Sequence, residues 1–328
     1  MTLSITRRLM MAAGAVALMV AGATGAASAQ EQIRFSAVFS DQDIRAEMMS
    51  RFAEAAGEDF AFNGYYGGSL FRQGTELVAL QRGNLEMGNI APQDFAEQVP
   101  EWSLLTSAYL FRDADHLIAF FDSEAGGEMK DLVRERLGLH ILGPTYFGTR
   151  QVGLRGDRQI NTPADMNGVR LRMPGGDAWQ FLGQALGANP TAVAYAEVYT
   201  ALQTGAIDGQ DNPLPNVQNM KFYEVMDQIV LTSHLVGFDV LTVSGRFWDS
   251  LTEEQQARIQ TAADEAIAWS TAQHLEQEAA LVEEFREAGL EIYEPDLDAF
   301  RSHAQQRYLD SPQAANWPEG MLDRINAM

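Results

Sequence analysis

Apolar positions recur along the chain in two rhythms, one typical of strands and one typical of helices. Short alternating stretches at 33–39, 60–66 and 85–90 predict strands. Stretches at 46–56 and 75–82, with apolar residues three or four positions apart, predict helices between them. A chain that alternates strand and helix in this way predicts an α/β fold with a parallel sheet covered by helices.

The same alternation continues through the middle of the chain. Further helices are predicted at 115–121, 127–137, 179–186 and 197–203, and further strands at 139–146 and 169–173. Thr162-Pro163-Ala164-Asp165 has the residues of a helix start, with a capping hydroxyl, a first-turn proline and an acidic group near the N-terminal dipole. About 300 residues can form one large domain or two of typical size.

One predicted helix is much longer than the others. Helical periodicity runs from Glu253 to Ala288, after a capping-box pattern that begins at Ser250. At 1.5 Å per residue this helix would be ~54 Å long, so an unbroken helix must cross two domains. The alternative is two helices broken near Trp269.

We therefore predict two α/β domains that exchange segments. The first comprises residues 30–147 and 237–276, and the second comprises residues 148–236 and 277–328. No long linker is visible, so the chain should cross between them in short stretches, near 147–152 and 235–241. Two domains joined in this way should close on a ligand like a hinge.

The first 29 residues have the pattern of a signal peptide. Arg7 and Arg8 form a basic n-region, an apolar stretch follows at 9–21, and Ala27-Ser28-Ala29 fits a cleavage site. The apolar stretch is short for a membrane span of ~20 residues. We expect export, cleavage after Ala29 and a mature chain that begins at Gln30. The paired arginines leave the export route open between the twin-arginine and general pathways.

Composition excludes several classes of function. The chain has no cysteine, which excludes disulfides, thiol nucleophiles and zinc–thiolate sites. Its formal charge is -22, and a surface this acidic repels nucleic acid, so we expect no nucleic-acid partner. If the ligand is an anion, the overall field opposes it, and local arginines must provide the binding.

Enzyme motifs are missing. The sequence contains no dinucleotide-binding or phosphate-binding glycine loop, no serine-nucleophile elbow and no zinc-peptidase motif. The histidines are scattered without the spacing of metal ligands, at positions 116, 140, 234, 274 and 303. We therefore expect no catalytic residues, no metal and no cofactor.

The most informative stretch lies between Asn167 and Pro213. Arg172 stands at the carboxyl end of a predicted strand, the edge at which open α/β sheets bind ligands. A guanidinium there can hold a carboxylate through two parallel hydrogen bonds, and the amide of Asn212 can donate to the same group. Periodicity alone does not separate this interpretation from an ordinary exposed arginine. Arg170, on the same strand, should lie outside the pocket.

Three motifs in this stretch carry a family resemblance. They are Gly168-Val-Arg-Leu-Arg-Met-Pro174, Glu197-Val-Tyr-Thr-Ala-Leu-Gln-Thr-Gly205 and Asp208-Gly-Gln-Asp-Asn-Pro213. In order and spacing they resemble the signature region of the DctP-like family, the substrate-binding proteins of tripartite ATP-independent periplasmic (TRAP) transporters. The resemblance extends more thinly over most of the mature chain, including Tyr146-Phe-Gly-Thr-Arg150 and the helix after Trp248.

The resemblance implies a periplasmic binding protein fold, with a ligand cleft between two domains and a long helix spanning both. Arg172 matches the selectivity arginine that grips the ligand carboxylate, and Arg150 and Asn212 match residues that help to hold it. Tyr195 falls where related proteins carry an aromatic wall, and Gln73 falls in a loop that meets the distal part of the ligand. The Glu197-Val-Tyr199 motif is expected to be structural. Ala91 is apolar where a sialic-acid binder would be expected to carry a polar contact, which counts against sialic acid.

The expected function is therefore capture of a small organic acid and its delivery to the membrane subunits of a TRAP transporter, by a periplasmic protein that we expect to be a monomer. A C4-dicarboxylate, a sugar acid or another hydroxy or sulfonated acid all remain open as the ligand. The alternatives are a periplasmic lyase or hydrolase that acts on such acids and a ligand sensor for a receptor kinase. An enzyme would need an acid–base pair or a metal, and no such group stands out.

Overall fold

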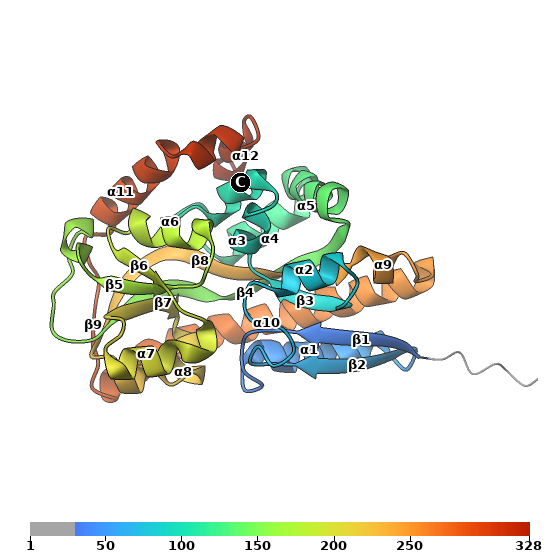
Figure 1. Ribbon diagram of the computed structural model, residues 1–328, viewed down its shortest axis with the longest axis horizontal. Coiled ribbons are helices and arrows are strands. Elements are labelled where there is room, and N and C mark those ends of the chain that lie inside the picture. Colours follow the sequence, from blue (N-terminus) through green and yellow to red (C-terminus); the bar gives the residue numbers. More distant parts are fainter. Residues whose placement is uncertain (1–29) are drawn as a thin grey trace, which may run out of the picture.

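The computed structural model describes residues 30–328, so the predicted signal peptide and its cleavage site lie outside the described residues. Within that range, nine strands form one sheet, in which eight follow the order β2-β1-β3-β8-β4-β7-β5-β6 and β9 pairs with β8 (Figure 1). The strands are β1 (Glu31–Ser36), β2 (Phe60–Tyr65), β3 (Met87–Ile90), β4 (Leu139–Leu154), β5 (Arg170–Met173), β6 (Asn189–Ala192), β7 (Gly209–Pro213), β8 (Gln228–Ser244) and β9 (Glu291–Tyr293).

The sheet is mixed, whereas the strand–helix rhythm predicted a parallel one. The outer pairs β1–β2, β1–β3, β5–β6 and β5–β7 are parallel. The central pair β4–β8 is antiparallel, and each of its members also pairs antiparallel with its outer neighbour. The reason is that the chain passes from one half of the molecule to the other along β4 and returns along β8, so the two crossings run in opposite directions.

Strands β4 and β8 are long because they serve both halves, which we call the first domain (with β1, β2 and β3) and the second domain (with β5, β6 and β7). The stretches 147–152 and 235–241, where crossings were expected, lie in the middle of these strands. The sheets of the two domains are therefore joined through the β4–β8 pair. The pairing is interrupted by register shifts between Tyr146 and Gly148 and between Arg150 and Val152.

Helices cover both faces of the sheet in the first domain. One face packs on a core that includes Phe95, Trp102 and Phe120, and the other packs on a core that includes Phe35 and Phe52. The helices are α1 (Ile44–Ala56), α2 (Glu76–Gln81), α3 (Pro92–Ala96), the 3-10 helix η1 (Pro100–Thr106), α4 (Ala114–Asp122), α5 (Glu124–Leu137) and α9 (Gly245–Trp248). Polar caps begin several of them, because the side chains of Asp43, Asp113 and Ser123 accept hydrogen bonds from first-turn backbone N–H groups.

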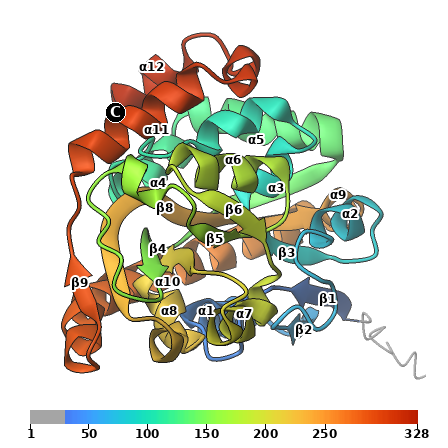
Figure 2. The same cartoon turned by 60° about the vertical axis from the view of Figure 1, so that its left-hand side comes forward.

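The second domain is also a sheet between helices, with α6 on one side and α7 and α8 on the other (Figure 2). Its helices are η2 (Pro163–Met166), α6 (Asp177–Ala185), η3 (Tyr195–Glu197), α7 (Val198–Thr204), α8 (Leu214–Asn219) and η4 (Phe222–Val225). The segment predicted to begin a helix at Thr162 forms only the short η2, although Thr162 and Asp165 do make a capping box.

The C-terminal helices divide between the two domains. Helix α11 (Leu297–Leu309) packs Phe300, Ala304 and Tyr308 into the core beneath α6. After the 3-10 helix η5 (Pro312–Asn316), α12 (Met321–Asn326) places Met321 and Ile325 in the first-domain core beside α5. Our division placed all of residues 277–328 in the second domain, and the position of α12 differs from that placement.

Helix α10 (Glu253–Glu287) is the long helix that the periodicity predicted, and it is unbroken at Trp269. Its 35 residues span about 52 Å and pass from α1 to α8 and β9 (Figure 1). Its first half packs Ile259, Ala263 and Ile267 in the first domain, and its second half packs Leu281 and Phe285 in the second. The capping box is formed by Thr252 and Gln255 rather than by the pattern beginning at Ser250.

No helix among residues 30–328 combines the length and apolar character needed to cross a bilayer.

Candidate functional site

A cavity lies between the two domains. Both domains and the crossing strands β4 and β8 contribute to its lining. The lining residues are Val38, Arg45, Gln73, Gly74, Glu76, Asn89, Ile90, Ala91, Asp94, Phe147, Arg150, Arg172, Pro174, Trp179, Tyr195, Asn212, Asn216 and Asp239. All five residues expected to contact the ligand, Arg172, Arg150, Asn212, Tyr195 and Gln73, are among them.

Arg172, on β5, is the most unusual of these groups, because its side chain is a buried charge without an ion-pair partner among residues 30–328. Only 1% of it is exposed. Its Nε donates to the carbonyl oxygen of Val193 at 2.8 Å and its Nη2 donates to Oε1 of Gln73 at 3.2 Å. Burial, which disfavours the charged form, lowers the pKa of Arg172 to about 10, so the guanidinium remains cationic at neutral pH. A buried cation held only by neutral acceptors has the capacity to pair with an anion.

Arg150, on β4, is by contrast already neutralised. Its Nε lies 2.7 Å from Oδ2 of Asp211, and its Nη2 donates to the backbone oxygen of Asp211 at 2.5 Å. The guanidinium also stacks 4.9 Å from the ring of Trp179. Burial alone would raise the pKa of Asp211, but the charge of Arg150 and a hydrogen bond from His234 hold that pKa well below its usual range.

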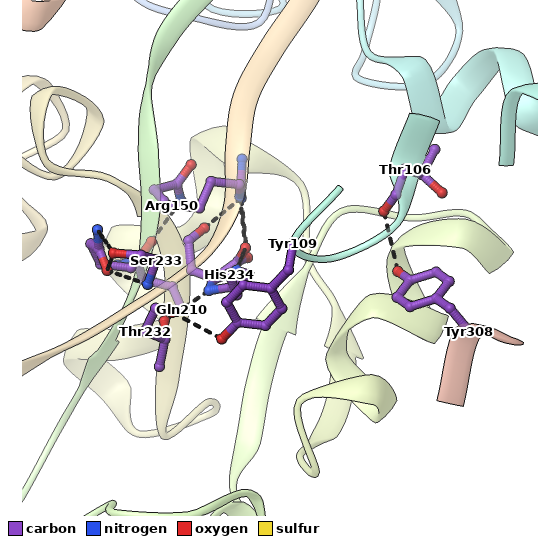
Figure 3. A network of polar contacts seen from close by, with 11 residues as sticks. Thr106, Tyr109, Arg150, Gln210, Thr232, Ser233, His234 and Tyr308 are labelled. Atoms are coloured by element: carbon purple, nitrogen blue, oxygen red, sulfur yellow. Dashed lines mark hydrogen bonds and ion pairs between the residues drawn. The ribbon is translucent and has the colours of Figure 1, made fainter. Parts of the chain in front are cut away.

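The network behind Arg150 extends through β8 (Figure 3). Nε2 of His234 lies 3.1 Å from Oδ2 of Asp211, and its Nδ1 lies 2.8 Å from Oγ1 of Thr232. Tyr109 anchors a first-domain loop to the same strand, because its backbone N donates to His234 and its hydroxyl donates to the carbonyl of Thr232. Burial lowers the pKa of His234, which favours the neutral ring. The network fixes the direction of the Arg150 side chain.

Asn212 and Tyr195 line the second-domain side of the cavity. Asn212, on β7, donates from Nδ2 to Oε1 of Gln210 at 2.6 Å. The hydroxyl of Tyr195 accepts a hydrogen bond from Nδ2 of Asn216 at 3.0 Å, and burial raises its pKa to about 12, so it stays protonated. The ring of Tyr195 lies 5.7 Å from the guanidinium carbon of Arg172. The tyrosine therefore acts as a wall beside that guanidinium.

Gln73 reaches this group from the first domain. It stands in the loop between β2 and α2, and its Oε1 accepts hydrogen bonds from Arg172 and from the backbone N of Tyr195, the latter at 2.9 Å. Glu97 crosses between the domains in a similar way, since its Oε1 accepts from the backbone N of Asp177 at 2.6 Å, at the start of α6. The exposed Arg72 and Glu197 also pair across the opening at 3.6 Å.

Arg170 lies outside the cavity, as expected. Its side chain is 48% exposed and forms an ion pair with Asp208. It also donates to the carbonyl oxygens of Gly205 and Ala206, both at 3.0 Å. This arginine therefore joins β5 to the turn after α7.

Sequence reasoning missed the first-domain wall of the cavity. Arg45, in the first turn of α1, is 2% exposed and binds Asp43 through Nε and Nη2 at 2.9 Å each. Its Nη1 donates to Oδ2 of Asp239 at 3.0 Å, and its guanidinium lies between the rings of Phe39 and Phe147, at 4.3 and 4.2 Å. The helix had been predicted to begin at Ala46, which hid Asp43 and Arg45 as a capping pair. The only available signal was the Asp43-Ile44-Arg45 spacing at the helix start.

Three acidic groups on the same wall were also missed. Burial raises the pKa of Glu76 to about 7 and, opposed by the charge of Arg45, that of Asp239 to about 6. Burial and the neighbouring charges of Glu76 and Asp239 raise the pKa of Asp94 to about 8. In a chain with 45 acidic residues, no pattern distinguished these three.

Residues 30–328 contain no cluster of three or more histidine, aspartate or glutamate side chains arranged to hold a metal ion.

Comparison with known proteins gives consistent matches over most of the chain. The family model for bacterial extracellular solute-binding proteins, family 7 (DctP), matches residues 35–313. The sialic acid-binding periplasmic protein SiaP of Vibrio cholerae is 32% identical over 230 residues, which is 70% of either chain.

Solved structures give the same result. A TRAP periplasmic solute-binding protein from Roseobacter denitrificans, with bound 3-deoxy-D-manno-oct-2-ulosonic acid, is 46% identical. It superposes with a TM-score of 0.90 and covers 91% of this chain and 99% of its own. A TRAP solute-binding protein from Sulfitobacter with bound β-D-galacturonate is 26% identical, with a TM-score of 0.83 and coverages of 90% and 98%.

Proposed function

This chain belongs to family 7 of the bacterial extracellular solute-binding proteins, the substrate-binding components of TRAP transporters, and we propose that the acid it captures is a sugar acid of the ulosonic type. The family's members are periplasmic solute-binding proteins that hold small carboxylates. The finer proposals concern the ligand, the residues that bind it and the way in which the domains close.

The observation that carries the proposal is Arg172. A guanidinium that is 1% exposed and has no ion-pair partner among residues 30–328 lines a cavity between two domains. Its remaining N–H groups, on Nη1 and Nη2, have the fork geometry that matches both oxygens of a carboxylate. Arg150 is already paired with Asp211, so it adds little net charge and orients the ligand through its remaining N–H groups.

The remaining expected contacts fit a polar ligand around that carboxylate. We assign Asn212 to a hydrogen bond with the carboxylate end, Tyr195 to a wall against the ligand body, and Gln73 to a contact from the first domain. The relative with bound 3-deoxy-D-manno-oct-2-ulosonic acid is 46% identical and superposes over 91% of this chain, which supports a similar ligand here. The resemblance to SiaP keeps sialic acid, another ulosonic acid, as the comparison ligand, although Ala91 lines the cavity without a polar group.

The remaining parts of the proposal follow from the architecture. Two bodies would move about the β4–β8 pair. The first comprises residues 30–147 and 237–276 and carries α12 with it, and the second comprises residues 148–236 and the rest of 277–328. We propose export with cleavage after Ala29, action as a monomer, and delivery to TRAP membrane subunits without chemical change. The enzyme alternative would require turnover of the bound acid, and the sensor alternative would lack neighbouring genes for a small and a large membrane subunit.

Thermal shift and calorimetry on residues 30–328 test the ligand. A compound that binds only the folded state raises the melting temperature by mass action. We expect 3-deoxy-D-manno-oct-2-ulosonic acid to give a larger shift than galacturonate or sialic acid, and succinate to give none. Nuclear magnetic resonance of the ligand after overnight incubation should show no product. A strong shift with succinate, with none for any sugar acid, would contradict the proposal.

A further inference from the structure

The first-domain wall of the cavity carries three carboxyl groups from three separate segments. Glu76 begins α2, Asp94 lies in α3 and Asp239 lies in β8. Glu76 is 4% exposed, and its Oε2 accepts a hydrogen bond from the backbone N of Thr75 at 3.0 Å. Oδ2 of Asp239 is occupied by Arg45 and by Nδ2 of Asn89, at 3.0 and 3.1 Å.

These groups have acceptor capacity that the chain itself does not use. Within residues 30–328, the carboxyl of Asp94 has no hydrogen-bond or ion-pair partner, and neither Glu76 nor Asp94 lies in an ion pair. Glu76 is buried and Asp94 is partly buried, and an acceptor that lines a cavity without a partner can take one from a ligand. The same cavity contains Arg172, which is 1% exposed and also lacks an ion-pair partner in this range. The cavity thus offers a cation on its second-domain side and unused acceptors on its first-domain side.

We propose, resting on the function proposed above, that Glu76, Asp94 and Asp239 form a subsite that accepts hydrogen bonds from the hydroxyl groups at the end of the ligand distal to its carboxylate. This subsite would select a polyhydroxylated acid over a deoxygenated or dicarboxylic acid of similar size. A site built to hydrogen-bond a hydroxyl group rejects an analogue that lacks it, because the buried acceptors are then left unpaired.

The charges around the wall favour hydroxyl groups over the other possible partners. A second carboxylate on the ligand would face the ionised carboxylate of Asp239 and the partly ionised carboxyl of Glu76, which disfavours C4-dicarboxylates. An ammonium group would lie beside the guanidinium of Arg45, which lines the same cavity and is fixed by Asp43 and Asp239. Hydroxyl groups carry no charge, and each can donate to a carboxylate or accept from a protonated carboxyl group.

The experiment uses the pair of variants Glu76→Gln and Asp94→Asn, singly and combined, which keep the shape of each side chain. The exposed Glu54→Gln on α1 is the control for the same loss of charge. Calorimetry with 3-deoxy-D-manno-oct-2-ulosonic acid, pyruvate and 6-aminohexanoate separates the parts of the site. Pyruvate carries the carboxylate without the hydroxyl chain, and 6-aminohexanoate carries an ammonium at the distal end.

We expect each wall variant to weaken binding of the ulosonic acid by roughly tenfold, the effect of losing about one hydrogen bond. Binding of pyruvate should not change, and Glu54→Gln should bind all three compounds like wild type. The melting temperature of the ligand-free wall variants should equal or exceed that of wild type, because each variant removes a carboxyl group whose ionisation is unfavourable in this cavity. This combination of a stable protein and weaker polyol binding distinguishes a ligand contact from a structural role.

Two results would overturn the inference. One is unchanged affinity of the double variant for every sugar acid that binds wild type. The other is tighter binding of 6-aminohexanoate than of the ulosonic acid, with loss of that preference in the double variant, which would assign the wall to a cation. Failure of all sugar acids to bind wild type would refute the proposed function itself, a result that is separate from either of these.

Discussion

Arg172 is the side chain on which anion binding depends most directly. Removing its guanidinium with Arg172→Ala should eliminate two charge-assisted hydrogen bonds to the ligand carboxylate, each worth ~1.5–3 kcal/mol. Affinity should fall by roughly two to four powers of ten, since ~1.4 kcal/mol is a tenfold change. Arg172→Lys should recover only part of this, because a point charge cannot reproduce the planar fork. Calorimetry with an acid that binds wild type measures the affinity of both variants.

Arg170→Ala is the matched control for that experiment. Arg170 lies two residues earlier on the same strand, outside the cavity, where it joins β5 to the turn after α7. Its ion pair is exposed, so the variant should keep ligand affinity with little loss of stability. If Arg170→Ala loses binding while Arg172→Ala retains it, the carboxylate has been assigned to the wrong arginine.

The raised pKa values of Glu76 and Asp94 predict how stability depends on pH. The pKa of Glu76 is raised from 4.5 to about 7 and that of Asp94 from 3.8 to about 8, so the folded protein binds these protons more tightly than the unfolded chain does. Their stabilising contribution is fully present below about pH 4 and is lost as the pH rises through 7 and 8. Burial lowers the pKa of His140 and His274 to about 4, which gives the opposite trend, but only below pH 6.5.

The informative window therefore lies above pH 6.5. Between pH 6.5 and 8.5 the ionisation of these two groups should remove roughly 2–3 kcal/mol of stability from the ligand-free protein, visible as a falling melting temperature. The combined Glu76→Gln and Asp94→Asn variant should show a flatter profile than wild type, and Glu54→Gln should follow wild type. A wild-type profile that rises over this window would show that these carboxyl groups are not held in their protonated form.

At the scale of single elements, the bulge in β4 positions Arg150. Gly148 has φ +113°, a conformation that side chains rarely adopt, and a Cβ there would lie 2.7 Å from Cβ of Pro213. Glu278 of α10 holds the bulge from the other side, with Oε1 accepting from the backbone N of Thr149 at 2.7 Å and Oε2 from the hydroxyl of Tyr146 at 2.6 Å. The long helix thus fixes the point at which β4 passes between the domains.

Gly148→Ala should therefore destabilise the protein by about 1–3 kcal/mol, the strain of an alanine in this backbone region. It should also weaken ligand binding, since Arg150 is two residues further along the strand. Gly127→Ala is the control, because Gly127 lies inside α5 with an ordinary helical backbone and open space at its Cβ position. That change should raise stability by roughly 0.5–1 kcal/mol. Thermal denaturation of both variants measures the difference.

Sequence periodicity predicted these elements well where the signal was local. The long helix was expected at 253–288 and found at Glu253–Glu287, since its apolar positions repeat without interruption. The antiparallel crossing of β4 and β8 could not be read in the same way, because strand direction depends on pairing between residues 139–154 and 228–244. Pairing at that separation leaves no local pattern.

The same difference between local and long-range signals explains which residues of the site could be predicted from the sequence. Arg172 and Asn212 stood out because each lies at the end of a predicted strand, and Arg150, Tyr195 and Gln73 because they match family positions. Arg45 and Asp94 did not stand out, because their place in the cavity depends on contacts with segments far away in the chain. The contact of Arg45 with Asp239 is an example. A buried charge in an acidic chain is indistinguishable from a surface charge until the fold brings its neighbours together.

At the scale of the whole molecule, few polar side chains bridge the two domains around the cavity. Gln73 binds Arg172 and Tyr195, Glu97 caps the start of α6, and Arg72 pairs with Glu197. The last pair is exposed and contributes little. On the opposite side, β4, β8 and α10 are continuous through both domains. This asymmetry predicts a hinge at the continuous side and opening at the cleft.

Small-angle scattering tests this motion. A ligand that bridges Arg172 in the second domain and the carboxyl wall in the first binds the closed arrangement better than an open one, so it must shift the population towards closure. We expect the radius of gyration of wild type to decrease when the ulosonic acid is added to saturation. Gln73→Ala, which removes two hydrogen bonds across the cleft, should be more open before addition and should show a larger decrease.

Closure excludes water from the carboxylate, and each hydrogen bond to it is then stronger. Gln73→Ala should therefore bind more weakly because a smaller fraction of the protein is ready to close. A radius of gyration that stays constant at saturating ligand in both proteins would mean that the ligand enters a rigid cleft, and affinity would then depend on the cavity residues alone.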